Sequence, residues 1–278
     1  MPEGHTLHRI ASQYQRRFAG AITRSTSPQG RFATESAVLD GRVMTAAEAY
    51  GKHLFCHFDD LTVHVHLGLL GKIAFTNGIP PEPVGALRWR LHRPDDGGNT
   101  ADLRGPTACE ILDPIQVDTI LARLGPDPLR SESDPLISWK RISRSRAPIA
   151  ALLMDQSIAA GVGNIYRAEL LYRHRVDPMM EGRLLRKSEW LAMWADLVEL
   201  MHDGVAKGRI DTVRDEHSPS AQGRAARTDR HGGEVYVYRR AGAQCLVCQA
   251  RVRMADLGGR NLFWCPRCQR TTRRRPKL

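Results

Sequence analysis

The two ends of this 278-residue chain carry side chains whose types and spacing could do chemistry. The chain begins Met1-Pro2-Glu3, and removal of Met1 would turn Pro2 into a secondary amine, a nucleophile that an internal proline cannot supply. The small side chain after Met1 favours that removal. The Glu3 carboxylate, fixed beside the amine, could carry protons. The start of the chain is therefore a candidate site of covalent catalysis.

Four cysteines near the other end form two Cys-x2-Cys pairs, which are separated by 16 residues: Cys245, Cys248, Cys265 and Cys268. Thiolates at this spacing suit one tetrahedral Zn²⁺ gripped by two turns of a β-hairpin. Because cysteine fills all four coordination positions, none is open for a substrate, and we expect a structural zinc. In an intracellular protein such pairs indicate a metal rather than disulfides.

Three polar side chains lie where anions commonly bind. Arg260 falls at the tip of the expected hairpin, where it either contacts a phosphate or is one surface arginine among many. Asn164 follows the glycine turn 161–163, whose backbone N–H groups suit an anion, or it simply caps the next helix. Lys52 follows Gly51 at an expected hairpin turn, where a lysine is most often simply solvated.

Two further pairs of residues allow more than one interpretation. Leu69 and Leu70 stand between two glycines at the end of an expected strand, where they either close the core or form a wedge for a base stack. His64 and His66 lie on one face of that strand with the spacing of metal ligands. With no third ligand in view, we expect a packed or hydrogen-bonded pair.

The composition indicates an anionic polymer as partner, because the formal net charge is +11 and the pI about 9.8. The segment 251–277 alone holds nine Lys and Arg residues and one acid. No apolar run approaches the length of a membrane span, and the start lacks the character of a signal peptide. We expect a soluble monomer in the cytoplasm, associated with the nucleoid.

The first part of the chain is expected to be a helix followed by strands. A helix is expected over residues 8–18, because Leu7 just before it and Ile10, Tyr14 and Phe18 within it fall on one face. The later apolar runs alternate with polar residues with a period of two, and turn signals separate them. This pattern predicts an antiparallel β-sandwich or barrel over residues 1–130. A segment rich in proline and acidic residues, 125–135, is typical of a linker.

The rest of the chain changes to helical periodicity. We expect helices at 149–157 and 165–174, a third capped by Ser188, a mobile polar loop at 212–233 and a strand at 235–238. The sequence therefore predicts a multidomain α+β protein. Its parts would be the sandwich or barrel of residues 1–130, a helical domain of 131–234 and a zinc hairpin of 235–278.

In combination these motifs resemble the formamidopyrimidine-DNA glycosylase/endonuclease VIII family over nearly the whole chain, most of all actinobacterial endonuclease VIII. The matching segments, in chain order, are Pro2-Glu3-Gly4, Gly51-Lys52-His53, 66–71, 125–129, 153–156 with 160–166, Gly259-Arg260 and 263–269. Residues 153–166 correspond to the helix–two-turn–helix motif. The resemblance thus implies a catalytic β-sandwich domain over residues 1–130 and a DNA-binding helical domain over 131–234. Each matching segment alone is a weak signal. Their occurrence in this order over nearly the whole chain is specific to the family.

The resemblance implies a bifunctional DNA glycosylase and AP lyase of base-excision repair, acting on oxidised bases and on pyrimidines in preference. Pro2 would attack C1′ of the damaged nucleotide and form a Schiff base, and Glu3 would act as general acid and base. Lys52 would belong to the same catalytic group. The iminium would acidify the adjacent sugar carbon, so that the strand is cut by β- and then δ-elimination.

The resemblance also implies a partner, damaged double-stranded DNA, and leaves open single-stranded and bubble DNA. Lys52, Asn164 and Arg260 would hold phosphates around the lesion while the base leaves the stack. Leu69 and Leu70 would fill the space that the base vacates.

Three departures from the family pattern limit the prediction. His5 and Thr6 replace the second proline and glutamate of the usual start, which affects the surroundings of the amine. Gly68 stands where endonuclease VIII types carry a polar wedge, and the loop 104–107 lacks the aromatic of guanine-directed members. The main alternative is a catalytically weak protein that binds DNA damage or abasic sites. An AP lyase with little glycosylase activity is a second, and a zinc-dependent RNA-binding protein would leave Pro2-Glu3 unexplained.

Overall fold

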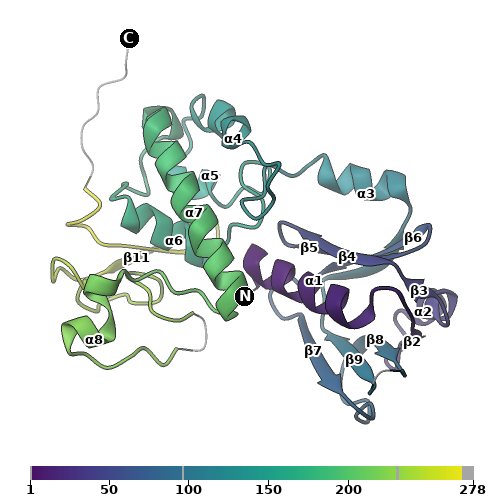
Figure 1. The fold of residues 1–278 in the computed structure, drawn as a ribbon. Coiled ribbons are helices and arrows are strands. Elements are labelled where there is room, and N and C mark those ends of the chain that lie inside the picture. Colours follow the sequence, from purple (N-terminus) through teal and green to yellow (C-terminus); the bar gives the residue numbers. More distant parts are fainter. Residues whose placement is uncertain (1, 96, 230–231, 271–278) are drawn as a thin grey trace. The chain divides into compact units, whose positions relative to one another are not determined.

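The computed structural model describes residues 2–95, 97–229 and 232–270. It divides into two compact units, Met1–Arg123 and Leu124–Leu278 (Figure 1). Each unit has its own hydrophobic core. No helix in the described part of the chain is both long and apolar enough to cross a membrane.

The first unit contains two four-stranded antiparallel sheets, which confirms the predicted β-sandwich. One sheet has the order β10-β6-β5-β4, formed by Ala108–Leu112, Leu61–His66, His53–Phe58 and Ala46–Tyr50. The other has the order β2-β8-β9-β7, formed by Arg24–Thr26, Leu87–Arg93, Asn99–Arg104 and Lys72–Asn77. A small ladder pairs β1 (Ala21–Ile22) with β3 (Val43–Met44), and the helices α2 (Ala33–Leu39) and α3 (Pro114–Leu121) complete the unit.

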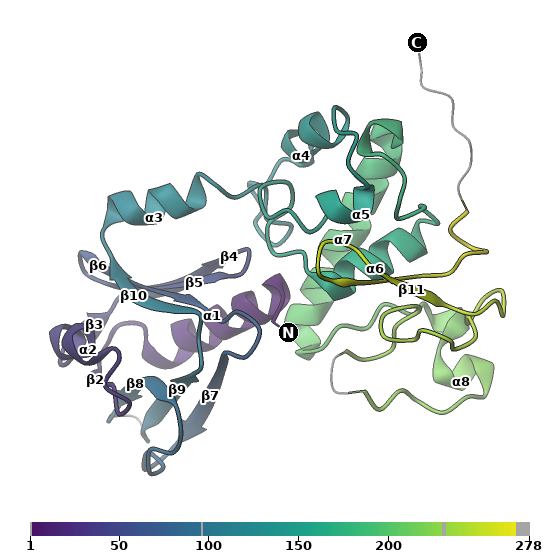
Figure 2. The same ribbon diagram turned by 180° about the vertical axis from the view of Figure 1, so that it is seen from behind.

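Helix α1 (Gly4–Phe18) packs against β4, β5 and β9 (Figure 2). The apolar stripe predicted from the sequence is confirmed, because Leu7, Ile10, Tyr14 and Phe18 are all buried. The helix begins four residues before the expected His8, with Glu3 in extended conformation as its N-cap. Trp89 on β8 is fully buried and stacks against Tyr14, so aromatic side chains join the helix to the second sheet.

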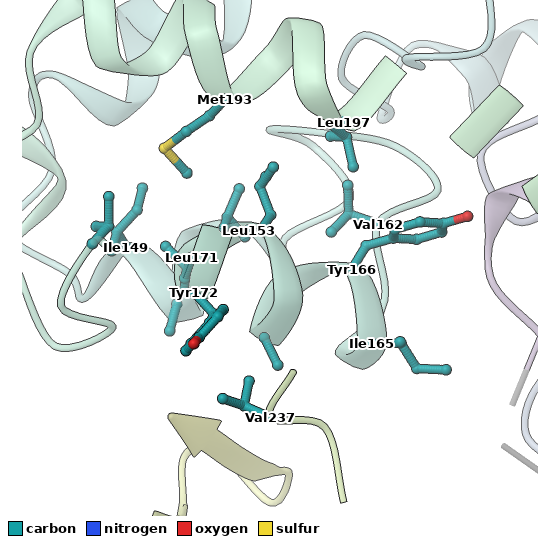
Figure 3. Packing of buried hydrophobic residues seen from close by; sticks show 14 of the residues in the cluster. Ile149, Leu153, Val162, Ile165, Tyr166, Leu171, Tyr172, Met193, Leu197 and Val237 are labelled. Atoms are coloured by element: carbon teal, nitrogen blue, oxygen red, sulfur yellow. The ribbon is translucent and has the colours of Figure 1, made fainter. Parts of the chain in front are cut away.

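The second unit is helical and ends in a β-hairpin. Its elements are α4 (Pro135–Ile142), α5 (Ile149–Leu152), α6 (Asn164–Arg173), η1 (Gly182–Leu184), α7 (Lys187–Lys207), η2 (Asp215–His217), α8 (Pro219–Gln222), β11 (Arg253–Asp256) and β12 (Asn261–Trp264). Apolar residues from α5, α6, α7 and the segment before the hairpin meet in one core, in which Leu171, Met193 and Val237 take part (Figure 3). The hairpin therefore shares a hydrophobic core with the helices.

Three helix boundaries differ from the sequence prediction. Helix α5 ends at Leu152 instead of Ser157, because the chain turns there and the Gln156 side chain binds backbone groups of the turn at Gly161 and Val162. The N-cap of α6 is Gly163, so Asn164 is the first helical residue and not the cap. Helix α7 is preceded by Arg186, whose N–H donates to the Glu189 carboxylate, so the prediction of Ser188 as the cap was wrong.

The segment 235–238, predicted to be a strand, is irregular. Its backbone N–H groups turn toward one carboxylate, that of Glu169 on α6. Glu169 accepts hydrogen bonds from the N–H groups of Tyr236, Val237 and Tyr238 at 2.7, 2.8 and 2.8 Å. A buried anion thus replaces the neighbouring strand as the partner of these N–H groups. Part of the polar segment 212–233 is also ordered, in η2 and α8.

Candidate functional site

The N-terminal residues lie where α1 begins. Pro2 is half-buried, and the Glu3 side chain is 0% exposed. The backbone of Glu3 accepts the N–H of Thr6 at 2.9 Å, which holds both residues against the first helical turn. His5 is also buried, and burial, with the charges of His8 and Arg9, lowers the pKa of its imidazole to about 4. A neutral His5 and the buried Glu3 side chain therefore both follow the candidate nucleophile within three residues.

Lys52 occupies a two-residue hairpin turn between β4 and β5. Tyr50 and His53 are paired across the turn, and Gly51 takes a φ of 57°. A positive φ at the first turn position suits glycine, because it has no Cβ to clash. The predicted turn is therefore present, and it fixes where the Lys52 backbone lies on this sheet.

Leu69 and Leu70 lie in the loop between β6 and β7, and their exposed fractions are 59% and 86%. This exposure contradicts a role in closing the core and leaves the wedge interpretation. Adjacent exposed leucines can insert into an apolar partner surface, but other large apolar side chains of this chain are exposed as well, Ile79 and Ile115 among them.

Gly68 explains one departure from the family pattern. Its φ is +64°, and a Cβ at this position would lie 1.9 Å from the Thr107 Oγ1. The Thr107 N–H in turn donates to the His66 carbonyl at 2.8 Å. The two departures noted in the sequence, Gly68 and the loop 104–107, are thus in contact, and no wedge side chain fits at position 68.

Asn164 begins α6 and is 7% exposed. Its amide Nδ2 donates to the backbone carbonyl of Asn261, at the start of β12, at 3.0 Å. Arg167, one helical turn later, donates to the same carbonyl at 3.1 Å and also to the Asn164 Oδ1. Asn164 is therefore joined to the hairpin that carries Arg260. An amide nitrogen has two hydrogens, so this contact leaves one for a further acceptor.

Arg260 lies at the tip of the hairpin between β11 and β12 and is exposed, as the sequence predicts. The tip is a tight turn in which the N–H of Leu257 donates to the Arg260 carbonyl at 2.9 Å. Gly258 and Gly259 have φ values of 60° and 72°, a conformation that disfavours other residues. The guanidinium is consequently carried by a short, well-defined turn.

The four cysteine sulfurs lie within 4.8 Å of one another, the only such group of His, Cys, Asp or Glu ligands in the described residues. The Cys245–Cys268 and Cys248–Cys265 sulfur distances are 3.9 and 3.4 Å. Ligands at about 2.3 Å from a tetrahedral zinc would be about 3.8 Å apart, so the four sulfurs fit this metal. The two Cys-x2-Cys turns also have the same backbone hydrogen bond, from the residue after the second cysteine to the first.

Tyr172 on α6 contacts this cluster. Its hydroxyl lies 3.1 Å from the Cys245 sulfur, and burial and the neighbouring thiols raise the pKa of Tyr172, so the O–H remains a donor. Burial opposes ionisation of Cys245, but hydrogen bonds from Tyr172 and the backbone of the turn outweigh it and lower its pKa to about 7. The thiolate of Cys245 is thus favoured, whereas burial raises the pKa of Cys265 and of Cys268.

The site residues divide between the two units. Pro2, Glu3, Lys52, Leu69 and Leu70 belong to the first, and the remainder belong to the second: Asn164, Arg260, Cys245, Cys248, Cys265 and Cys268. The sequence prediction missed Arg167, Glu169 and Tyr172, which connect α6 to the hairpin segment. Arg167 and Glu169 could have been found from the sequence as charged residues within a largely apolar helical segment. In the structure both are buried, as are most residues of α6.

Comparison with known protein domains defines the class. The formamidopyrimidine-DNA glycosylase N-terminal domain matches residues 1–109, and the formamidopyrimidine-DNA glycosylase H2TH domain matches residues 124–215. A structure of Lactococcus lactis Fpg bound non-covalently to DNA with an AP site covers 97% of this chain and 100% of that one, with a TM-score of 0.79 and 20% identity. At that identity the likeness establishes the fold, that of the H2TH DNA glycosylases.

Sequence relatives make the assignment narrower. Endonuclease 8 1 of Mycobacterium tuberculosis is 52% identical over 277 residues, covering 97% of this chain and 100% of the relative. Formamidopyrimidine-DNA glycosylase of Thermosynechococcus vestitus is 29% identical over 245 residues, covering 83% and 81%. The chain belongs to the formamidopyrimidine-DNA glycosylase/endonuclease VIII family, as the sequence motifs predict.

Proposed function

We propose that this protein is a bifunctional DNA glycosylase and AP lyase of base-excision repair, which removes oxidised bases, pyrimidines in preference, from double-stranded DNA. The observation that carries the proposal is the carboxylate of Glu3, which is 0% exposed and directly follows Pro2 at the start of α1. Burying a carboxylate is costly, and such groups concentrate at catalytic sites. Membership of the glycosylase family supports the same conclusion.

The proposed reaction begins with the amine of Pro2, once Met1 has been removed. The amine attacks C1′, the bond from C1′ to the damaged base breaks, and the proton that the amine loses passes through Glu3 to the departing base. A second proton, taken from solvent and delivered through Glu3 to the ring oxygen O4′, then breaks the C1′–O4′ bond and leaves the iminium. The resulting iminium acidifies C2′. Loss of a C2′ proton then breaks the bond to the 3′ phosphate, and a second elimination breaks the bond to the 5′ phosphate. Glu3 is the group placed to accept and return these protons.

Binding is proposed to rest on phosphate contacts. Lys52, Asn164 and Arg260 supply one ammonium, one amide and one guanidinium, each suited to phosphate oxygens. The exposed Leu69 and Leu70 are proposed to enter the space that the extruded base leaves. The net charge of +11 favours association with DNA at low salt and supports a location on the nucleoid, in the cytoplasm.

We also propose that the four cysteines hold one structural Zn²⁺. Bound zinc would fix the two Cys-x2-Cys turns against each other and thereby the base of the hairpin that ends in Arg260. Because the metal would have no open position, no reaction step passes through it. We further propose that residues 1–130, 131–234 and 235–278 act as a catalytic, a DNA-binding and a zinc-hairpin domain in a monomer.

The test compares mature protein with a variant that keeps one extra residue before Pro2, so that its nitrogen is part of an amide. Labelled duplexes contain an oxidised pyrimidine, an abasic site or no damage, and single-stranded copies are run in parallel. The proposal predicts cleavage of both damaged duplexes by the mature protein and none by the extended variant. Tight binding of damaged DNA by fully processed protein without any cleavage would contradict it and support a damage-binding protein.

A further inference from the structure

A chain of hydrogen bonds crosses three strands of the first unit. Glu110 on β10 and His64 on β6 are paired in register, and the Glu110 Oε1 lies 2.9 Å from the His64 Nδ1. The His64 Nε2 lies 2.8 Å from the Nδ1 of His53, the first residue of β5. The three side chains form a continuous path that ends beside Lys52, the residue preceding His53.

The carboxylate at one end of this path determines which nitrogen donates in each of its hydrogen bonds. A carboxylate only accepts, so the His64 Nδ1 must carry a hydrogen. In the neutral form of His64 the Nε2 is then bare, and it must accept from the His53 Nδ1–H. The Nε2 of His53 is left as a lone pair. Glu110 therefore selects the tautomer of His53 through His64.

His53 directly follows Lys52 in the chain, and the Lys52 charge acts on its ring. Burial lowers the pKa of His53 to about 3, with further contributions from the charges of His64, His66 and Lys52. The pKa of His66 is lowered by burial and by the same charges of His64 and Lys52. Both imidazoles therefore stay neutral beside the ammonium. His64 is 4% exposed, and its ring lies within 20° of the plane of the His53 ring with the centroids 5.1 Å apart, as an in-plane hydrogen bond between the two rings requires; this restricts both rings.

A metal site does not account for these histidines. In the described part of the chain only the four cysteines bring three or more ligand atoms within 4.8 Å. The contact between His53 and His64 also has the length of a hydrogen bond between ring nitrogens.

We propose that Glu110, His64 and His53 form a relay that positions Lys52: the relay locks His53 as a neutral acceptor whose lone pair orients the Lys52 ammonium toward a DNA phosphate. His53, His64 and Glu110 are positioning residues and take no part in bond breaking. This inference rests on the proposed function for the phosphate contact of Lys52, but the tautomers that it requires are independent of activity.

The first test reads the tautomers directly, by long-range ¹H–¹⁵N spectra of protein with ¹⁵N-labelled histidine at pH 8. We expect the Nδ1–H form for both His53 and His64, opposite to the Nε2–H preference of free histidine. Glu110→Leu should give mixed tautomers at both rings, and Glu110→Gln, which keeps an acceptor oxygen, should retain the wild-type form. An Nε2–H tautomer of His53, or an imidazolium at His64, in the wild type would overturn the relay.

The second test is a double-mutant cycle on binding to a duplex with a tetrahydrofuran abasic analogue. Glu110→Leu should weaken binding about fivefold, the equivalent of one net hydrogen bond, and Glu110→Gln less than twofold. Glu110→Leu should have no further effect when Lys52 is already alanine. Additive losses would overturn the positioning role.

The matched control is Glu48→Leu. Glu48 lies on β4 of the same sheet, is exposed to a similar degree (47% against 52% for the Glu110 side chain) and lies 3.4 Å from the ring of His57, outside the relay. It should bind the analogue duplex within about twofold of wild type. If wild-type protein fails to bind this duplex, the proposed function fails, whereas the spectra still decide the relay.

Discussion

Replacing Glu169 should destabilise the second unit more than any surface change. The carboxylate accepts the three N–H groups of residues 236–238 and the hydroxyl of Thr212, whose oxygen lies 2.5 Å away. In Glu169→Ala the three buried N–H groups lose their acceptor, at about 1–3 kcal/mol each. Relaxation of the segment recovers part of that sum, so we expect unfolding to become easier by about 4 kcal/mol. Such a loss is a large part of typical stability, about 5–15 kcal/mol.

Urea unfolding followed by tryptophan fluorescence measures this loss, because four of the five tryptophans lie in the second unit: Trp139, Trp190, Trp194 and Trp264. Glu169→Gln keeps one acceptor oxygen and should lose about half as much. The control is Glu199→Ala on the exposed face of α7, which should change stability by less than about 0.5 kcal/mol. A loss below about 1 kcal/mol in Glu169→Ala would refute the claim that this carboxylate holds residues 236–238.

Three further outcomes are expected. Gly68→Ala should lower stability by about 1–3 kcal/mol in thermal unfolding, because the residue has a positive φ and its Cβ would meet Thr107; a neutral effect would contradict this contact. His5 has a folded pKa of about 4, so the unfolded state binds more protons below about pH 6.5, and stability should fall as the pH drops from 6.5 toward 4. Urea unfolding at several pH values should show that His5→Gln flattens this dependence, and an unchanged slope would exclude His5 as its source. Arg260→Ala should reduce the log–log salt slope of DNA binding by about 0.9, the value for one phosphate, and an unaltered slope would exclude that contact.

Features of short range could be predicted from the sequence. The stripe of α1, the turn at Gly51-Lys52 and the clustering of the four cysteines each depend on residues within one element or one hairpin. The exposed positions of Leu69 and Leu70 needed the family resemblance as well, because two leucines beside a strand suit a core equally well.

Features that depend on distant partners could not be predicted in this way. The strand expected at 235–238 has the right composition, but Glu169, 67 residues away from Tyr236, takes its N–H groups. Tyr172 and Cys245 are 73 residues apart, and no local pattern joins them. The helix caps were misplaced by one or two residues, because glycine and arginine occupy the cap positions before α6 and α7 where asparagine and serine are commoner.

The central claim is that the amine of Pro2 is the nucleophile, and the most direct measurement locates the covalent bond. Mature protein is reacted with an abasic-site duplex, the Schiff base is reduced with borohydride, and the digested adduct is sequenced by mass spectrometry. The account predicts the sugar remnant on the peptide that begins with Pro2, at its amine. A remnant on a lysine instead, at Lys52 for example, would contradict it.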